Sequence, residues 1–181
     1  IKFFSKNFSI DKILAFEPSE RNFKILKKKT QKFQNLSLFK IGLGEKRSYV
    51  DFLEHYDSES STLVKINKKS KYFKKKNFYL DFFNFNEKNM SMTKINIDRL
   101  ENILNEQKID IINILKIDTE GYDFNVIKGL GKFITKVNYI YFEHHYHNML
   151  KKDYNFSELS TFMKENNFKK IFKSKMFFRK T

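Results

Sequence analysis

The sequence contains no cysteine and no tryptophan, and it has a single proline. Without cysteine the chain has no disulfide framework and no thiolate metal site, which fits a reducing compartment such as the cytoplasm. No apolar run approaches the roughly 20 residues that a membrane-spanning helix needs. A signal-peptide pattern is also missing, and the chain begins with Ile1 rather than methionine. We therefore expect a cytoplasmic protein without a membrane span, and this sequence is expected to be a piece of a longer chain.

The residues that are present suffice for one globular domain. Of the 181 residues, 40% are hydrophobic, so a sizeable core can form. Internal repeats and linkers are absent from the sequence, which favours a single domain over residues 1–181.

A net charge of +15 raises the question of a nucleic-acid partner. The densest basic segment, Lys65–Lys76, holds seven lysines and no arginine, although arginine is the expected reader of phosphates and guanine edges. Abundant Lys, Asn, Ile and Phe are also what an A+T-rich coding sequence gives. A solvated basic surface is therefore the favoured interpretation, and nucleic acid is the less favoured partner.

The chain is organised around the stretch Ile109–Gly131. Its apolar run Ile111–Ile117 predicts a strand buried on both faces of a parallel sheet. The run stops at Asp118-Thr119-Glu120-Gly121, and a helical pattern follows at once, with Gly129 and Gly131 available to end it. Ligands of open parallel sheets bind just beyond the carboxyl ends of the strands, so this turn is a candidate site.

A second unit of this kind lies near the start of the chain. Ile10–Phe16 predicts a strand, Ser19 is the expected N-cap of the helix that follows, and Leu36–Leu43 predicts the next strand. The other expected elements are a helix at Ile1–Phe8, strands at Tyr49–Leu53, Met92–Ile97 and Val137–Phe142, helices capped by Asp98 (with Glu101 in a capping box) and by Ser157, and a hairpin of Phe168–Phe172 with Lys175–Lys180.

This alternation predicts an α/β fold with a mostly parallel sheet, helices on both faces and a C-terminal hairpin. Three of its strand ends carry acids: Glu17, the pair Asp118 and Glu120, and Glu143. An acid at such a position can accept hydrogen bonds from the two hydroxyls of a ribose, which describes an NAD site and an S-adenosylmethionine site equally well. For Glu17 the alternative is a carboxylate that only interacts with the helix dipole.

Several segments resemble the FkbM family of S-adenosylmethionine-dependent methyltransferases. Phe16-Glu17-Pro18-Ser19 resembles its second-strand motif, and Leu115–Tyr122 (LKIDTEGY) resembles its most recognisable segment. Ile41–Glu45 is similar to the small-residue turn after the third strand, and Glu143-His144-His145 to a Glu-x-His ending on the fifth. The family's glycine-rich first-strand motif has no counterpart and is expected upstream of Ile1. The resemblance thus implies a Rossmann-like class I methyltransferase fold that lacks its first strand here.

The resemblance also implies roles for individual residues. S-adenosylmethionine would be the cofactor, with Glu17 and the adjoining Pro18 at its ribose and Gly42 and Leu43 beside its adenine. Asp118 is expected to face the sulfonium cation.

The methyl acceptor implied by the resemblance is a hydroxyl of a sugar, a polysaccharide or a secondary metabolite. His145 is the candidate general base because histidine titrates near neutral pH, and Asp118 is its rival.

Alternatives remain open at this point. Glu143, His145 and His147 alternate onto one strand face and could ligate a metal, or they could simply form a polar strand end; we expect no metal. The whole chain could instead be a catalytically silent basic module that binds nucleic acid or an anionic glycan. A nicotinamide-dependent enzyme is a further rival, which the Asp118–Gly121 segment disfavours.

Overall fold

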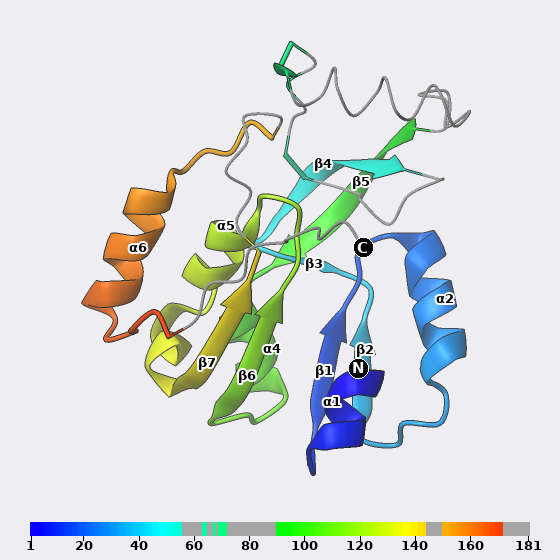
Figure 1. The fold of residues 1–181 in the computed structure, drawn as a ribbon. Coiled ribbons are helices and arrows are strands. Elements are labelled where there is room, and N and C mark those ends of the chain that lie inside the picture. Colours follow the sequence, from blue (N-terminus) through cyan, green and yellow to red (C-terminus); the bar gives the residue numbers. More distant parts are fainter. Residues whose placement is uncertain (56–62, 65–66, 68, 72–89, 144–149, 172–181) are drawn as a thin grey trace, which may run out of the picture.

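A computed structural model of the chain describes residues 1–55, 63–64, 67, 69–71, 90–143 and 150–171 (Figure 1). These residues form a mixed α/β structure with three small sheets. The helices are α1 (Lys2–Asn7), α2 (Glu20–Thr30), α4 (Leu100–Glu106), α5 (Asp123–Lys128), the 3-10 helix η2 (Gly131–Lys136) and α6 (Phe156–Glu165). The strands are β1 (Ile13–Phe16), β2 (Leu36–Phe39), β3 (Gly42–Leu43), β4 (Ser48–His55), β5 (Met90–Asp98), β6 (Ile112–Ile117) and β7 (Val137–Phe142).

The first sheet consists of β1 and β2, which are parallel and joined by α2. Helix α2 begins after Ser19, whose side chain accepts a 3.1 Å hydrogen bond from the amide of Asn22, so the predicted N-cap is confirmed. Phe16 and Phe39 are register partners, and their rings stack with centroids 5.0 Å apart. The strand–helix–strand unit expected from the sequence is therefore present.

The predicted strand Leu36–Leu43 is wrong as one continuous element. It divides at Lys40 and Ile41 into β2 and β3, and β3 belongs to a second sheet with the order β3-β5-β4. In that sheet β3 is parallel to β5, whereas β4 is antiparallel to β5. The antiparallel pairing of β4 carries the last residues of that strand, including Glu54, toward the start of α2.

The third sheet consists of the parallel strands β6 and β7, and β7 has the bounds predicted from the sequence. The expectation that β6 is buried on both faces is wrong. Its alternate residues Leu115 and Ile117 face the core formed by α4, α5 and α6, whereas Ile114 is 42% exposed. On the neighbouring strand Tyr139 and Tyr141 are exposed on the same side, because the described elements cover only one face of this sheet.

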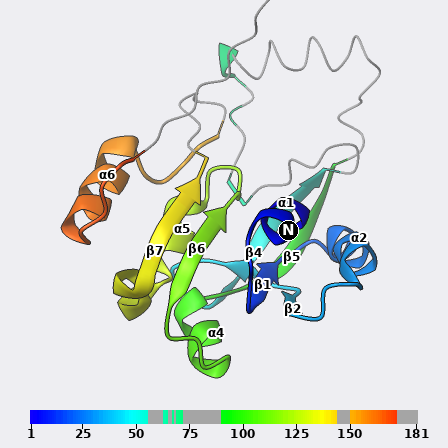
Figure 2. The same ribbon diagram turned by 60° about the horizontal axis from the view of Figure 1, so that its bottom comes forward.

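Each of the two parallel pairs has two outer edges, and no described strand occupies either of them. Within the part of the chain that the structure describes, β1 pairs only with β2, and β6 pairs only with β7. The strands β1, β6 and β7 point to the same edge of the molecule in Figure 1. In both Figure 1 and Figure 2, β6 lies between β7 and β1, while α6 and α2 lie at opposite ends. The carboxyl ends of β1 and β6 therefore lie at the same edge.

The main core surrounds α5. Val126, Ile127 and Leu130 are almost fully buried, and side chains from all three sheets belong to the same hydrophobic cluster. Helix α5 approaches β3 so closely that a Cβ atom on Gly129 would lie 2.2 Å from the carbonyl oxygen of Gly44. The backbone of Gly129 has φ −67°, so it is this contact, and not its conformation, that requires glycine.

Two predicted helix caps are wrong. Asp98 does not cap α4: it accepts hydrogen bonds from the amide of Arg99 and the side chain of Asn102, while Glu101 pairs with Arg99 instead of forming a capping box. The capping box is found on α6, but there the cap is Asn155 rather than Ser157, with Glu158 as its partner.

Of the predicted hairpin, residues 168–171 are described and do not form a strand. The remaining hairpin residues lie outside the described part of the chain.

We expect Gly129→Ala to lower the free energy of unfolding by about 1–3 kcal/mol, the usual cost of overpacking. Alanine favours helical backbone over glycine, so a loss can only come from the contact with Gly44. Urea unfolding followed by circular dichroism measures the change, with Lys136→Ala, at an exposed position of η2, as the control. A Gly129→Ala protein as stable as the parent would contradict the close approach of α5 and β3.

Candidate functional site

Glu17 follows the last residue of β1 and lies beside the N-terminus of α2. Its carboxylate accepts a 2.9 Å hydrogen bond from the amide of Ser19 and is half-buried. Burial raises the pKa of the Glu17 carboxyl, the Ser19 amide opposes this rise, and the negative charge of Glu54 adds to it. Proline at position 18 follows directly and is also half-buried. The structure therefore places Glu17 where a carboxylate can accept further hydrogen bonds from a ligand.

Glu54 is a neighbour of this site that the sequence reading did not single out. Its carboxylate accepts a short hydrogen bond from the hydroxyl of Ser19, although the two residues are 35 positions apart. Glu54 is 7% exposed and Phe52 is 4% exposed, so alternate residues of β4 face inward. The available signal was a carboxylate at an inward position of a strand. It was missed because the predicted strand ended at Leu53, one residue before Glu54.

Asp118 follows the last residue of β6, as predicted, and its side chain is 55% exposed. It forms a 2.8 Å ion pair with Lys116, which stands two residues earlier on the same face of the strand. Because the pair is exposed, it contributes little to stability and can open at small cost.

The turn after β6 has the unusual backbone that its sequence suggested. Glu120 and Gly121 both have positive φ, +49° and +97° respectively, so Gly121 supplies the conformational freedom that the turn needs. Asp123 closes the turn, because its buried carboxylate accepts hydrogen bonds from the amide and the hydroxyl of Thr119 at 3.3 and 3.0 Å. The sequence reading did not assign a role to Asp123.

Gly42 and Leu43 form β3 and pair with Ile97 and Asp98 of β5. The side chain of Leu43 is buried in the same cluster as Ile117, the last residue of β6. The turn after β3 and the turn after β6 are therefore held together by the core.

Glu17 and Asp118 follow strands of different sheets, and each has its own polar partners. The structure thus brings Leu43 close to the end of β6, and it joins Glu17 to Glu54 rather than to Asp118.

Other predicted residues lie outside the described part of the chain, namely His144, His145 and His147, as does most of the basic segment Lys65–Lys76. Glu143 is described and is exposed. In the ranges that the structure does describe, no group of three or more His, Cys, Asp or Glu side chains could hold a metal ion. None of the helices in those ranges is long and apolar enough to cross a membrane.

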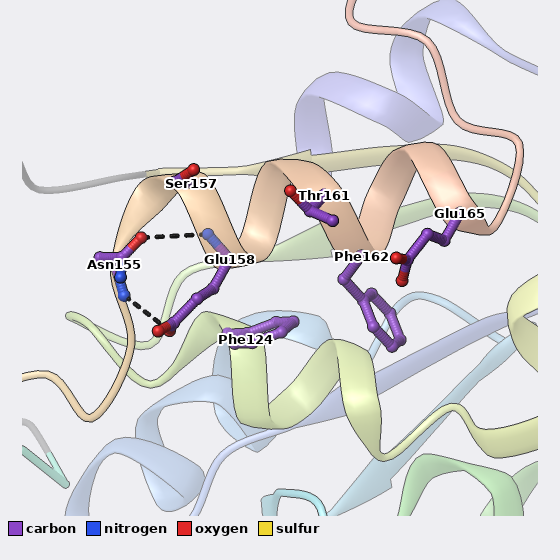
Figure 3. A pocket seen from close by; sticks show the side chains of 7 residues that line it. All are labelled: Phe124, Asn155, Ser157, Glu158, Thr161, Phe162 and Glu165. Carbon is purple, nitrogen blue, oxygen red and sulfur yellow. Dashed lines mark hydrogen bonds between the residues drawn. The ribbon is translucent and has the colours of Figure 1, made fainter.

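A pocket of about 450 Å³ lies beside α6. Six of its seven lining residues come from α6 or its cap, and Phe124 of α5 forms its floor (Figure 3). The dashed lines in Figure 3 are the two hydrogen bonds between Asn155 and Glu158 that cap the helix. No predicted site residue lines this pocket, so it is not the candidate site.

Comparison with protein families identifies the chain. The family model described as "Methyltransferase FkbM domain" matches residues 1–170. The chain belongs to the FkbM methyltransferase family. Neither the curated proteins nor the solved structures gave a significant match. At the level of the family this domain is that of a methyltransferase, for which S-adenosylmethionine and a Rossmann-like fold are typical.

We expect Glu17→Gln to stabilise this FkbM domain at neutral pH. The folded state raises the pKa of Glu17 above its ordinary value of 4.5, so the folded protein binds this proton more tightly than the unfolded chain does. Stability therefore falls as the pH rises through the folded pKa, and the substitution removes that loss. The gain in free energy of unfolding should shrink as the pH is lowered toward 4.

Urea unfolding between pH 4 and pH 8 measures this dependence. Glu20→Gln is the matched control, because its salt bridges with Lys40 and Lys24 lower the pKa of the exposed Glu20 carboxyl. That carboxyl stabilises the fold above its unfolded pKa, so its removal should not stabilise the protein at neutral pH. A Glu17→Gln protein with the same pH dependence as the parent would contradict the unfavourable burial of Glu17.

Proposed function

We propose that this FkbM domain transfers the methyl group of S-adenosylmethionine to a hydroxyl oxygen of a sugar, a polysaccharide or a secondary metabolite. One observation supports it most: Glu17 is a half-buried carboxylate with a raised pKa, held beside the N-terminus of α2 in a chain of the FkbM family. A carboxyl group that is perturbed by burial and by a neighbouring charge is a candidate for a functional site.

The residues at the end of β1 fit the ribose of this cofactor. A carboxylate can accept four hydrogen bonds, and the amide of Ser19 uses one of these positions on Glu17. The two ribose hydroxyls would donate to the others, and Pro18 would line the same edge. Gly42 and Leu43 would flank the adenine, since β3 ends near the turn that follows β6.

Asp118 would hold the sulfonium end of the cofactor. A carboxylate about 4 Å from a cation gains roughly 4 kcal/mol at an effective dielectric constant near 20, before desolvation is subtracted. Lys116 pairs with Asp118, so this ion pair would open when a cationic ligand binds. The site would thus become locally acidic only when Lys116 moves away from Asp118.

S-adenosylmethionine would supply an electrophilic methyl group. The protein would contribute by holding the acceptor oxygen in line with that group, and such positioning supplies up to about 7–11 kcal/mol in well-oriented cases. A general base would take the proton of the acceptor hydroxyl for a further 10²–10⁴-fold, roughly. His145 is the proposed base and Asp118 the alternative.

We further propose that one more parallel strand, from upstream of Ile1, lies between β1 and β6. The edges of these two strands are unpaired within the described residues, and an unpaired backbone edge is a template for another strand. That strand would complete a single Rossmann-like sheet and carry the glycine-rich motif that wraps the methionine part of the cofactor. The 181-residue chain alone would then be inactive.

Isothermal titration of S-adenosylhomocysteine tests both proposals on two proteins, the 181-residue chain and a chain extended upstream. We expect binding to the extended chain only. Glu17→Ala in the extended chain should weaken binding by about ten-fold or more, the value of a hydrogen bond to a charged group. Binding to neither protein would reject the methyltransferase proposal and lead to titrations with polyanions, whereas unchanged affinity in Glu17→Ala would remove Glu17 from the site.

Asp118→Asn should weaken the binding of S-adenosylmethionine, which carries a sulfonium cation, more than that of S-adenosylhomocysteine, which lacks the sulfonium charge. The expected change in the ratio of the two affinities is about ten-fold, equal to roughly 1.4 kcal/mol. Lys116→Gln is the opposite test, because it leaves Asp118 without its cation and should favour S-adenosylmethionine. Methyl transfer should fall with Asp118→Asn, and wild-type activity of that variant would contradict our placement of the site.

A further inference from the structure

We propose that Glu54 is a positioning residue of the ribose site: it fixes the hydroxyl of Ser19, and through Ser19 it holds the carboxylate of Glu17. This inference rests on the proposed function, because it assigns Glu54 to the same cofactor site. It adds a residue from β4 that neither the sequence motifs nor the family match points to.

The hydrogen bonds around Ser19 define the direction of its hydroxyl. The amide of Asn22 donates to Oγ of Ser19 at 3.1 Å, and this is the N-cap bond of α2. The single hydroxyl proton is therefore available for donation, and Glu54 Oε1 accepts it. The amide of the same residue donates to Glu17 Oε1 at 2.9 Å. One serine thus connects both carboxylates to the first turn of the helix.

Burying Glu54 beside Ser19 costs folding free energy, so its presence there calls for an explanation. Ser19 is 2% exposed and Glu54 is 7% exposed, and burying a carboxylate is unfavourable without strong partners. An N-cap serine needs no carboxylate as its acceptor, because a neutral oxygen would serve equally well. The negative charge of Glu54 also raises the pKa of Glu17, so the pair opposes folding at neutral pH. Cap stability therefore does not account for Glu54.

The N-terminus of α2 explains how two carboxylates can lie so close together. An 11-residue helix presents partial positive charge at its start, which favours anionic groups there. The third carboxylate of this region, Glu20, is exposed and pairs with Lys24 and Lys40 on the outside of the helix. Glu17 and Glu54 are thus the two acids on the inner side.

The consequence for a ligand is a carboxylate with a fixed orientation. Glu17 Oε1 is held by the backbone amide of Ser19, and the hydrogen bond from the Ser19 hydroxyl to Glu54 restrains the same residue from its side-chain end. A pre-oriented acceptor loses less conformational freedom when the ribose hydroxyls bind, so affinity and selectivity for an intact ribose increase.

Titration calorimetry with two ligands tests this role in the chain extended upstream, at pH 7.5. The ligands are S-adenosylhomocysteine and its analogue that lacks both ribose hydroxyls. We expect Glu54→Ala to weaken binding of S-adenosylhomocysteine three- to ten-fold, roughly, and to leave the affinity of the dideoxy analogue unchanged. Glu54→Gln, whose amide oxygen can accept the same hydrogen bond from Ser19, should restore binding.

Two control variants distinguish a failure of the role of Glu54 from a failure of the proposed function. Glu101→Ala removes a partly buried carboxylate on α4 and should change the affinity of neither ligand. Glu17→Ala should abolish the preference for the intact ribose. If Glu17→Ala loses this preference but Glu54→Ala retains it, the role of Glu54 is overturned and the proposed function stands. If the parent protein does not bind S-adenosylhomocysteine, both are overturned.

A measurement without ligand covers the case in which Glu54→Ala does not fold. Carbon-detected NMR titration of the Glu17 carboxyl in the 181-residue chain and its Glu54→Gln variant should show a lower Glu17 pKa in the variant, because the neighbouring charge is gone. An unchanged titration of Glu17 would show that the two side chains are not coupled and would overturn the inference. If Glu54→Gln loses the same affinity for both ligands, Glu54 has only a structural role and the inference is likewise overturned.

Discussion

The packing around α5 is the interaction on which the other features depend. The three sheets are not paired with one another in the described ranges, yet side chains from all of them meet in the cluster that surrounds this helix. Each fully buried Ile or Leu there stabilises the fold by about 1.5–3 kcal/mol relative to exposure. The glycine at position 129 permits the close approach between the end of α5 and the backbone of Gly44, which follows β3.

Local sequence patterns predicted the elements that local forces determine. The period of apolar residues gave β1, β5, β6 and β7 to within a few residues, and Ser19 capped α2 as expected. Helix caps were less predictable where neighbouring polar residues compete for the same position. Asp98 is already engaged by Asn102 and Arg47, so it does not cap α4. On α6, Asn155 and not Ser157 is the cap. The burial of β6 was overestimated, because an apolar run does not reveal whether another element covers its second face.

The candidate site was predictable only in part for the same reason. The positions of Glu17 and Asp118 directly after β1 and β6 were predicted from the sequence, because each follows an apolar run that ends there, while their roles at a site stay predictions. The ion pair of Asp118 with Lys116 follows from the two-residue period of a strand and could also have been predicted. Glu54 could not, since its contact with Ser19 joins residues 35 positions apart through the pairing of β4 with β5. A strongly basic chain can therefore bring acids such as Glu17 and Glu54 together in a way that only its tertiary structure reveals.

The uncovered face of the β6–β7 sheet has a consequence for handling the isolated chain. Ile114, Tyr139 and Tyr141 are exposed there beside a strand edge without a described partner, which is the arrangement that leads to aggregation through edge-to-edge association. A net charge of +15 opposes such association by mutual repulsion. Repulsion acts over about 10 Å at 0.1 M salt and about 3 Å at 1 M. We therefore expect the 181-residue chain to associate more readily as the ionic strength rises, because screening weakens the repulsion that keeps the exposed sheet faces apart.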